Sequence, residues 1–402
     1  MPTFAYVVKD KTGKTHSGTL ETGSRNALIE QLWKQEFVVL SIDERTSQKS
    51  SLLKVGQPRV KADQLVIFSR QLATMVDSGI PISASLDVLA EQMEDRGFRQ
   101  TLKKIRDDIE AGASLSEAMS RHPKVFAEFF VNMVRAGESS GRLDEILDRV
   151  ASYLEKSSAL QRKVKASLFY PAFVSFLAFA ITTFLIVVIV PKFKEIFASL
   201  GGQLPLPTLM LLGLSEFMGH YLVYEVIAAI AVVVAFRVYI NTPSGRMWFD
   251  HTTLRVPVIG KLMQKVVIAR FSRTLATLVR SGVPILGSLE IVAKTAGNKV
   301  VEKAVMAARS SIKEGENIAD PLATSKVFPA MVTRMISVGE KTGELEKMLT
   351  KIADFYENEV DAAVTAMTSL IEPLVIAILG VVIGGIVVAL FLPIFKLPTM
   401  VH

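Results

Sequence analysis

The sequence contains no cysteine, only five scattered histidines and no recognisable catalytic motif. Without cysteine the chain can form no disulfide, no iron–sulfur cluster and no thiolate zinc site. The histidines lack the HExxH spacing of a zinc enzyme, and no Gly-x-Ser-x-Gly elbow is present. A phosphate-binding loop ending at Gly13-Lys14 would need a glycine where Val8 stands. We therefore predict a protein that is not an enzyme and that has no catalytic residue, metal site or cofactor.

Charge is missing from two long apolar stretches, residues 172–190 and 373–395. Each is long enough to cross a hydrocarbon core of roughly 30 Å at about 1.5 Å per residue. A third stretch, residues 218–236, is weaker because Glu225 interrupts it, and a carboxylate in lipid needs a neighbouring helix, water or an interfacial position. Because 21% of the residues are still charged, we expect soluble helical parts joined to three transmembrane helices.

Lysine and arginine gather beside these stretches and indicate their orientation. They precede the first span and follow the second, whereas only Lys192 and Lys194 lie between the two. Positive flanks mark the cytoplasmic side of a span. Residues 1–14 also lack the apolar core of a signal peptide. We therefore expect a cytoplasmic N-terminus, and we attribute the net charge of +7 to membrane topology rather than to nucleic-acid binding.

An internal duplication is the strongest signal in the sequence. FSRQLATMVDSGIPISASLD from Phe68 matches FSRTLATLVRSGVPILGSLE from Phe271, with 13 of 20 positions identical. Later, GESSGRLDEIL from Gly137 matches GEKTGELEKML from Gly339. Apolar residues recur at helical spacing in both copies. The repeated unit is thus a soluble helix bundle followed by one span, and the middle span returns the chain between copies.

Two kinds of glycine-containing joint recur in the copies. In the first, Gly79 and Gly282 can take the left-handed conformation that ends a helix, and Pro81 and Pro284 suit the start of the next. The second joint is Gly-Glu-x-x-Gly-x-Leu. It comprises Gly137, Glu138 and Gly141 in one copy, and Gly339, Glu340 and Gly343 in the other.

Two interpretations of the second joint stay open. In one, its glutamate lies near the positive end of the helix that follows, and the joint is a capped turn. In the other, it is a contact surface for a partner or a second copy. Gly137 and Gly339 are expected at the turn itself, where a positive φ would exclude other residues. Arg70 and Arg273 occupy matching positions and could pair with these glutamates or remain exposed.

Further candidate residues lie at the spans. Proline at a membrane entrance is expected to kink its helix, and a small-xxx-small pattern lets another helix approach closely. The residues are Tyr170, Pro171, Glu372 and Pro373 at the entrances, and Glu225, Gly380 and Gly384 for packing within the membrane.

We predict an all-α membrane protein: two duplicated cytoplasmic antiparallel helix bundles, three transmembrane helices and a small N-terminal α+β module. The expected segments are the α+β module (1–45), a linker (46–57), the first bundle (58–170), a transmembrane helix (171–190), an external loop (191–217), a second transmembrane helix (218–236), the second bundle (237–371), a third transmembrane helix (372–395) and a short external tail (396–402).

These motifs resemble the PilC/GspF family, the inner-membrane platform proteins of type IV pilus assembly and type II secretion. The resemblance rests on the SGIPI and SGVPI hairpins, the two GExxGxL joints and the Tyr-Pro and Glu-Pro pairs, and it covers nearly the whole chain. The terminal LPIFKL from Leu392 is more similar to the pilus branch than to the secretion branch.

The resemblance implies a multi-pass protein of the bacterial inner membrane that couples a hexameric cytoplasmic ATPase to pilin extraction and filament assembly. Its implied partners are that ATPase, pilin or pseudopilin subunits, inner-membrane alignment proteins, lipid and further copies of itself, but no nucleic acid. A platform of type II secretion is the alternative. An oligomeric transporter or channel is another, although three spans enclose little volume and Glu225 is the only ionisable residue within them.

Overall fold

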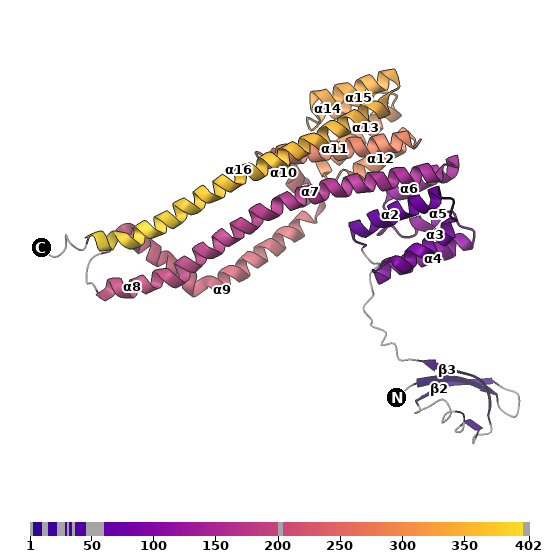
Figure 1. Ribbon diagram of the computed structural model, residues 1–402, viewed down its shortest axis with the longest axis horizontal. Helices are drawn as coiled ribbons and strands as arrows, with labels where there is room; N and C mark the ends of the chain where they lie inside the picture. Colours follow the sequence, from indigo (N-terminus) through magenta and orange to yellow (C-terminus); the bar gives the residue numbers. More distant parts are fainter. Residues whose placement is uncertain are drawn as a thin grey trace. The chain divides into compact units, whose positions relative to one another are not determined.

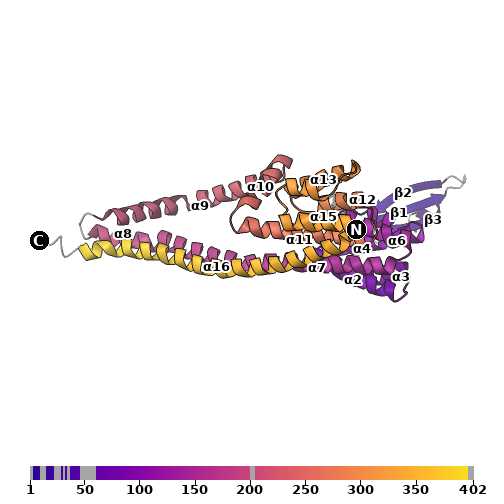
Figure 2. The ribbon, with the colours of Figure 1, turned by 90° about the horizontal axis from the view of Figure 1, so that it is seen from above.

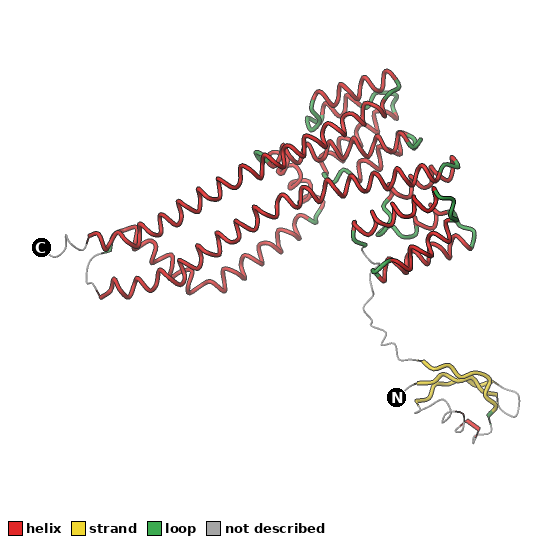
Figure 3. The backbone as a smooth tube through the Cα atoms, viewed as in Figure 1, coloured by secondary structure: helices red, strands yellow, loops and turns green. Residues whose placement is uncertain are grey.

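The computed structural model describes residues 3–9, 15–21, 29, 32–33, 37–45, 60–199 and 204–396. The chain forms two compact units, residues 1–58 and 59–402. Figure 3 distinguishes the sheet of the first unit from the helices of the second. The predicted fold class is confirmed: helical bundles in duplicate, three helices long and apolar enough to cross a membrane, and a small N-terminal module.

The first unit contains a three-stranded antiparallel sheet in the order β2-β1-β3. Its strands are β1 (Thr3–Lys9), β2 (Thr15–Glu21) and β3 (Val38–Arg45). Val8 on the central strand is buried together with Leu32. Part of the α+β module expected at residues 1–45 and the whole linker expected at 46–57 lie outside the described residues.

The second unit begins with the first helix bundle and its span (Figure 1). The helices are α2 (Ala62–Asp77), α3 (Ile82–Gln92), α4 (Arg96–Glu110), α5 (Leu115–Ser120), α6 (Glu128–Ser140) and α7 (Leu143–Phe184). Phe68, Phe98, Phe126 and Phe130 form the centre of the bundle, with edge-to-face ring pairs at centroid distances of 5.4, 5.9 and 5.1 Å. Such pairs add to the burial of large apolar side chains.

The span of the first copy continues through a π-helical turn, η1 (Leu185–Ile189), into α8 (Val190–Ser199). Helix α9 (Leu206–Ile240) then returns the chain, and α10 (Pro243–Arg255) joins it to the second copy. Helix α9 starts well before residue 218, because Pro205 caps it and Pro207 suits its first turn. Helices α8 and α9 therefore occupy most of the segment expected to be a loop, residues 191–217.

The second bundle repeats the first. It comprises α11 (Ile259–Arg280), α12 (Ile285–Thr295), α13 (Lys299–Lys313), α14 (Ala319–Thr324), α15 (Ala330–Thr342) and α16 (Leu345–Lys396). Phe271, Leu275 and Leu278 are fully buried, as the apolar spacing predicted. Helix α16 has 52 residues, so at 1.5 Å per residue it is roughly 78 Å long and far exceeds a bilayer core.

Helices α7 and α16 run side by side in the same direction, as Figures 1 and 2 show. Leu160 and Val164 of α7 pack with Val360 and Val364 of α16. Farther along, Ile186 and Val190 lie in one cluster with Ile386 and Leu390 of α16 and Leu211 and Leu212 of α9. Each long helix therefore leads from a bundle toward the far end of the spans, with α7 continuing through η1 into α8.

Candidate functional site

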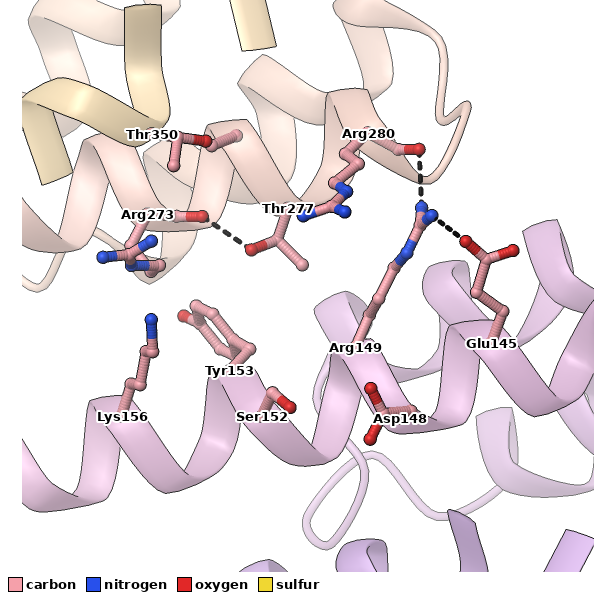
Figure 4. Close-up of a pocket in the computed structure, with 11 residues that line it drawn as sticks. Glu145, Asp148, Arg149, Ser152, Tyr153, Lys156, Arg273, Thr277, Arg280 and Thr350 are labelled. Atoms are coloured by element: carbon pink, nitrogen blue, oxygen red, sulfur yellow. Dashed lines mark hydrogen bonds and ion pairs between the residues drawn. The ribbon is translucent and has the colours of Figure 1, made fainter. Parts of the chain in front are cut away.

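A cleft separates the two copies at the level of the bundles (Figure 4). Its volume is about 290 Å³. One wall is a row on α7, and the other is a row on α11 with Thr350 of α16. The lining residues are Glu145, Asp148, Arg149, Ser152, Tyr153 and Lys156 on α7, and Arg273, Ala276, Thr277 and Arg280 on α11.

Arg149 bridges this cleft. Its Nη1 donates to the backbone oxygen of Arg280 at 2.6 Å, and its Nη2 pairs with Glu145 on its own helix (Figure 4). The accepting oxygen belongs to the last turn of α11, where unpaired carbonyls attract a cation. Arg149 thus fixes the end of a helix in one copy from the long helix of the other.

Tyr153 makes a buried contact at the same interface. Its hydroxyl shares a hydrogen bond of 3.0 Å with the hydroxyl of Thr274 on α11. Burial raises the pKa of Tyr153. The ring also packs on Phe129 of α6, with centroids 4.1 Å apart. Lys294 of α12 binds Glu128 of α6 at 2.9 Å, and Lys163 of α7 binds Asp361 of α16 at 2.6 Å.

Arg70 and Arg273 each bind a carboxylate of the long helix in their own copy. Arg70 binds Glu155 through two hydrogen bonds of 2.6 and 2.7 Å, and Arg273 binds Glu357 through two of 2.8 Å. The bond to Glu155 raises the pKa of Arg70 and lowers that of Glu155. For Arg273 burial lowers the pKa, but the hydrogen bonds to Glu357 and Asp354 outweigh it. These arginines are therefore paired, but with acids of the helix that follows each joint rather than with Glu138 and Glu340.

Glu138 and Glu340 do cap helix ends, although not those of the helices that follow them. Glu138 accepts from the backbone N–H of Leu115 at 2.6 Å, at the start of α5. Glu340 accepts from the backbone N–H of Ile318 at 2.7 Å, at the start of α14. The carboxylates therefore lie at positive helix ends, as expected, but they connect α6 to α5 and α15 to α14. The other oxygen of Glu340, Oε2, is buried without a hydrogen-bond partner in the described part of the chain.

The expected positive φ at Gly137 and Gly339 is wrong, because both residues lie inside helices. The left-handed residues are Gly141 and Gly343, which end α6 and α15 with φ of 66° and 73°. A Cβ on Gly137 would meet Leu143 Cα at 3.2 Å, and one on Gly339 would meet Leu345 Cα at 2.9 Å. These two glycines therefore permit close helix packing rather than a turn.

The first kind of joint forms as predicted. Gly79 and Gly282 have φ of 79° and 77°, and Pro81 and Pro284 stand directly before the next helix. The backbone N–H of Ile80 reaches back to Met75 O at 3.0 Å, which closes the end of α2.

The candidate residues of the spans lie apart from the cleft. Pro171 and Pro373 are inside α7 and α16, next to Tyr170 and Glu372. Glu225 is half-buried near the middle of α9. A Cβ at Gly380 or Gly384 would meet nothing within 4 Å. Close packing at these two glycines therefore remains a prediction for contacts beyond the described chain.

Sequence reasoning missed a pair of hydroxyl contacts where the three spans meet. Thr208 of α9 donates to Ala389 O of α16 at 2.5 Å, and Ser215 donates to Ile186 O at 2.6 Å. Ala389 precedes Pro393 by four residues, and proline has no N–H with which to bond that carbonyl. We call these two hydrogen bonds the hydroxyl clamp.

The same explanation holds for the first copy. In the π-turn, Val190 N–H bonds Leu185 O, five residues back. At that spacing Pro191 stands opposite Ile186 O and leaves it without a backbone donor. Pro191 and Pro393 end their spans at matching places in the two copies, and that repetition is the sequence signal that could have revealed the clamp.

No group of three His, Asp or Glu side chains suited to a metal ion occurs among the described residues. Most charged side chains of the cleft are instead paired with other side chains or with backbone groups, such as Asp148 with Arg70 and Arg273 with Glu357. This arrangement can hold two helical bodies in a fixed relation, and it contains no nucleophile paired with a base.

The fold defines a helical membrane protein in which two copies of one soluble bundle each extend into a span. The family model "Type II secretion system (T2SS), protein F" matches residues 68–191 and 271–393, and the model of the N-terminal domain of that protein matches residues 1–43. The chain belongs to this family, a family of membrane platform proteins that is not a known enzyme family.

Curated relatives match over almost the full length. The type IV pilus assembly protein PilC of Thermus thermophilus is 43% identical over 402 residues, covering 99% of this chain and 98% of the relative. PilC of Myxococcus xanthus is 41% identical over 394 residues, covering 98% and 94%. The type II secretion system protein F of Vibrio cholerae is 32% identical over 403 residues, covering 99% and 98%. The chain is therefore a platform protein of a type IV pilus or a type II secretion system.

Proposed function

We propose that this chain is the inner-membrane platform of a type IV pilus and that it couples a cytoplasmic hexameric ATPase to pilin extraction and filament assembly. The observation that supports the pilus branch is sequence identity, which is 43% and 41% to two pilus assembly proteins and 32% to a secretion protein. Pilin, inner-membrane alignment proteins and lipid are the further partners in this proposal.

The two long helices support a coupling role. Helix α16 has 52 residues and reaches the cluster where the three spans meet, and α7, with 42 residues, continues into that cluster through η1. A continuous helix held by packing at both ends transmits a displacement of the bundle as a rigid body. A force applied to the bundles would therefore reach the membrane directly.

Deletion of the gene tests the branch of the family. We expect loss of surface filaments, restored by the wild-type chain, and unchanged export of type II secretion substrates. Lost export with intact pili would instead identify the secretion system. Co-purification of the assembly ATPase with the full-length chain from membranes tests the coupling partner.

The proposed topology places the two bundles in the cytoplasm and the turn between α8 and α9 outside. The native chain has no cysteine, so single cysteines report cleanly. In cells with a permeabilised outer membrane, an impermeant maleimide should label Ser199→Cys at the end of α8 and spare Ser310→Cys on α13. Equal labelling of both would contradict this topology.

The proposed domain division treats the first bundle, residues 58–170, as self-contained, and the fragment 58–165 tests this without the membrane span. Its four central phenylalanines all lie within that segment. The fragment should therefore be soluble and helical, with a cooperative thermal transition by circular dichroism. An insoluble or unfolded fragment would count against the division.

A further inference from the structure

The two copies meet through different faces of the repeated bundle. At the level of the bundles, the first copy contributes α6 and α7, and the second contributes α11 and α12, which are the counterparts of α2 and α3. Farther along, the counterpart helices α7 and α16 pack on each other. A contact between unlike faces is heterologous, so each copy retains one unused half of it. Among the described residues of the second unit, the unused halves are the α2–α3 face of the first copy and the α15–α16 face of the second.

Counterpart residues show that these free faces carry the same apolar positions. Tyr153 and Phe129 are 8% and 3% exposed at the contact, whereas their counterparts Phe355 and Met331 on the α15–α16 face are 47% and 42% exposed. Together with a third such side chain on the opposite face, these exposed apolar residues at matched positions exceed the scattered apolar residues expected on the surface of a soluble protein.

The opposite face shows the same relation. Ile291 of α12 lies one turn from Lys294, which binds α6, and is 4% exposed. Its counterpart on α3, Val88, is 44% exposed. Three positions that the first contact buries are therefore apolar and exposed on the free faces, whereas Thr274 has the polar, half-buried counterpart Gln71.

A row of residues on α11 lines the cleft between the copies and is repeated on α2. Arg273, Ala276, Thr277 and Arg280 face the residues of α7 across that cleft. Their counterparts line a separate hollow of about 460 Å³ together with three acids of α7. The residues of this hollow are Arg70, Ala73, Thr74 and Asp77, with Asp144, Glu145 and Asp148.

The charges at the end of this row favour one kind of binding partner for the free α2–α3 face. Arg149 reaches the backbone oxygen of Arg280 across the cleft. The counterpart of Arg149 is Lys351, and that of Arg280 is Asp77, and both are exposed. A lysine would thus meet an aspartate at the mouth of an acidic hollow, where opposite charges attract.

We propose that a second copy of this chain docks its α15–α16 face, marked by Met331, Lys351 and Phe355, on the α2–α3 face, marked by Asp77 and Val88. Because α7 and α16 run in the same direction, repeating the operation that relates the two copies keeps every span in one membrane. The ion pair of Lys294 and Glu128 is not repeated, since Glu91 and Ala330 stand at its counterparts, so the contact is quasi-equivalent. A head-to-tail contact of this kind generates either a closed ring of chains or an open helical filament.

Crosslinking in membranes tests the contact on full-length protein. Asp77→Cys and Lys351→Cys are carried on two differently tagged chains, expressed together and treated with a short bismaleimide. We expect a crosslinked dimer from the mixture and none from either variant alone. A chain with both Arg149→Cys and Arg280→Cys is the matched control and should crosslink internally. Lys313→Cys, exposed on α13, replaces Lys351→Cys as the negative control.

Charge reversal gives a second, independent result. Asp77→Lys or Lys351→Asp should each lower the oligomeric fraction in native mass spectrometry by roughly 1.5- to 5-fold, and the double variant should restore it. Phe355→Arg should also dissociate one chain from the other without changing the thermal stability of either chain, because the Phe355 side chain is exposed. Three results would each overturn the proposal: the control chain crosslinks internally while no crosslink forms between the two tagged chains, the double variant fails to restore the oligomeric fraction, or the wild-type protein is monomeric.

Discussion

The hydroxyl clamp makes a prediction that separates a hydrogen bond from simple packing. Thr208→Val keeps the shape of the side chain and removes the hydroxyl that donates to Ala389 O. Thr208 is fully buried, so no water replaces that donor. The carbonyl of Ala389 is then left without a partner, because Pro393 has no N–H to offer.

The expected cost follows from measured values of comparable bonds. A buried carbonyl without a donor costs about 1–3 kcal/mol in soluble proteins, and hydrogen bonds between membrane helices average about 0.6 kcal/mol with a maximum near 1.7. We therefore expect Thr208→Val to cost about 0.5–2 kcal/mol. Local opening of the clamp would then be roughly 2 to 30 times more frequent.

Hydrogen exchange of residues 206–217, measured by mass spectrometry in nanodiscs, reads this opening directly. Pro393→Ala supplies an N–H to the carbonyl of Ala389, so Thr208→Val should have little effect in that background. The clamp contains its own control: Pro393→Ala should not rescue Ser215→Ala, whereas Pro191→Ala should. Equal exchange in Thr208→Val and wild type, or rescue of both variants by one alanine, would refute the assignment of hydroxyls to prolines.

Three further predictions concern the bundles. Gly339→Val should destabilise the second bundle by about 1–3 kcal/mol through a clash with α16, measured as a lower melting temperature of the full-length protein. Glu340→Gln should cost only about 0.3–1 kcal/mol if the side chain merely caps α14, with filament assembly intact, and assembly that fails at normal abundance and melting would reveal a partner contact instead. The pKa of Glu155 is lowered by Arg70, so its contribution to stability is present above the unfolded pKa of about 4.3 and is lost as pH falls through the lower folded value. In an acid titration of fragment 58–165, Glu155→Gln should accordingly flatten the loss of stability below pH about 4.3.

The sequence predicted the features that depend on local chemistry. Gly79 and Gly282 have the positive φ that a helix end followed by proline requires. Phe68 and Phe271 are fully buried at matching places, because the duplication repeats the apolar spacing of one helix. The three candidate spans followed from charge-free length, which needs no knowledge of neighbours.

What the sequence did not predict depends on which helices meet. Glu138 was expected to cap the nearest helix along the chain, yet it caps α5, more than twenty residues earlier. Gly137 was assigned to the turn because glycine is typical there, whereas the turn needs only Gly141 and the packing of α6 on α7 needs Gly137. Both errors treated a residue as serving its own joint when its role lies across a helix interface.

The hydroxyl clamp also explains how α9, which has no counterpart in the duplication, can pack against the spans of both copies. Pro191 and Pro393 leave the same defect at the same place in each copy, and α9 covers both with hydroxyls seven residues apart. Seven residues are two helical turns, about 10.5 Å along the axis, so Thr208 and Ser215 point from one face of α9. That face is in contact with η1 at one hydroxyl and with α16 at the other. The position of α9 along its axis is therefore fixed by both copies at once, and the two spans cannot separate at this end without exposing two unpaired carbonyls to lipid.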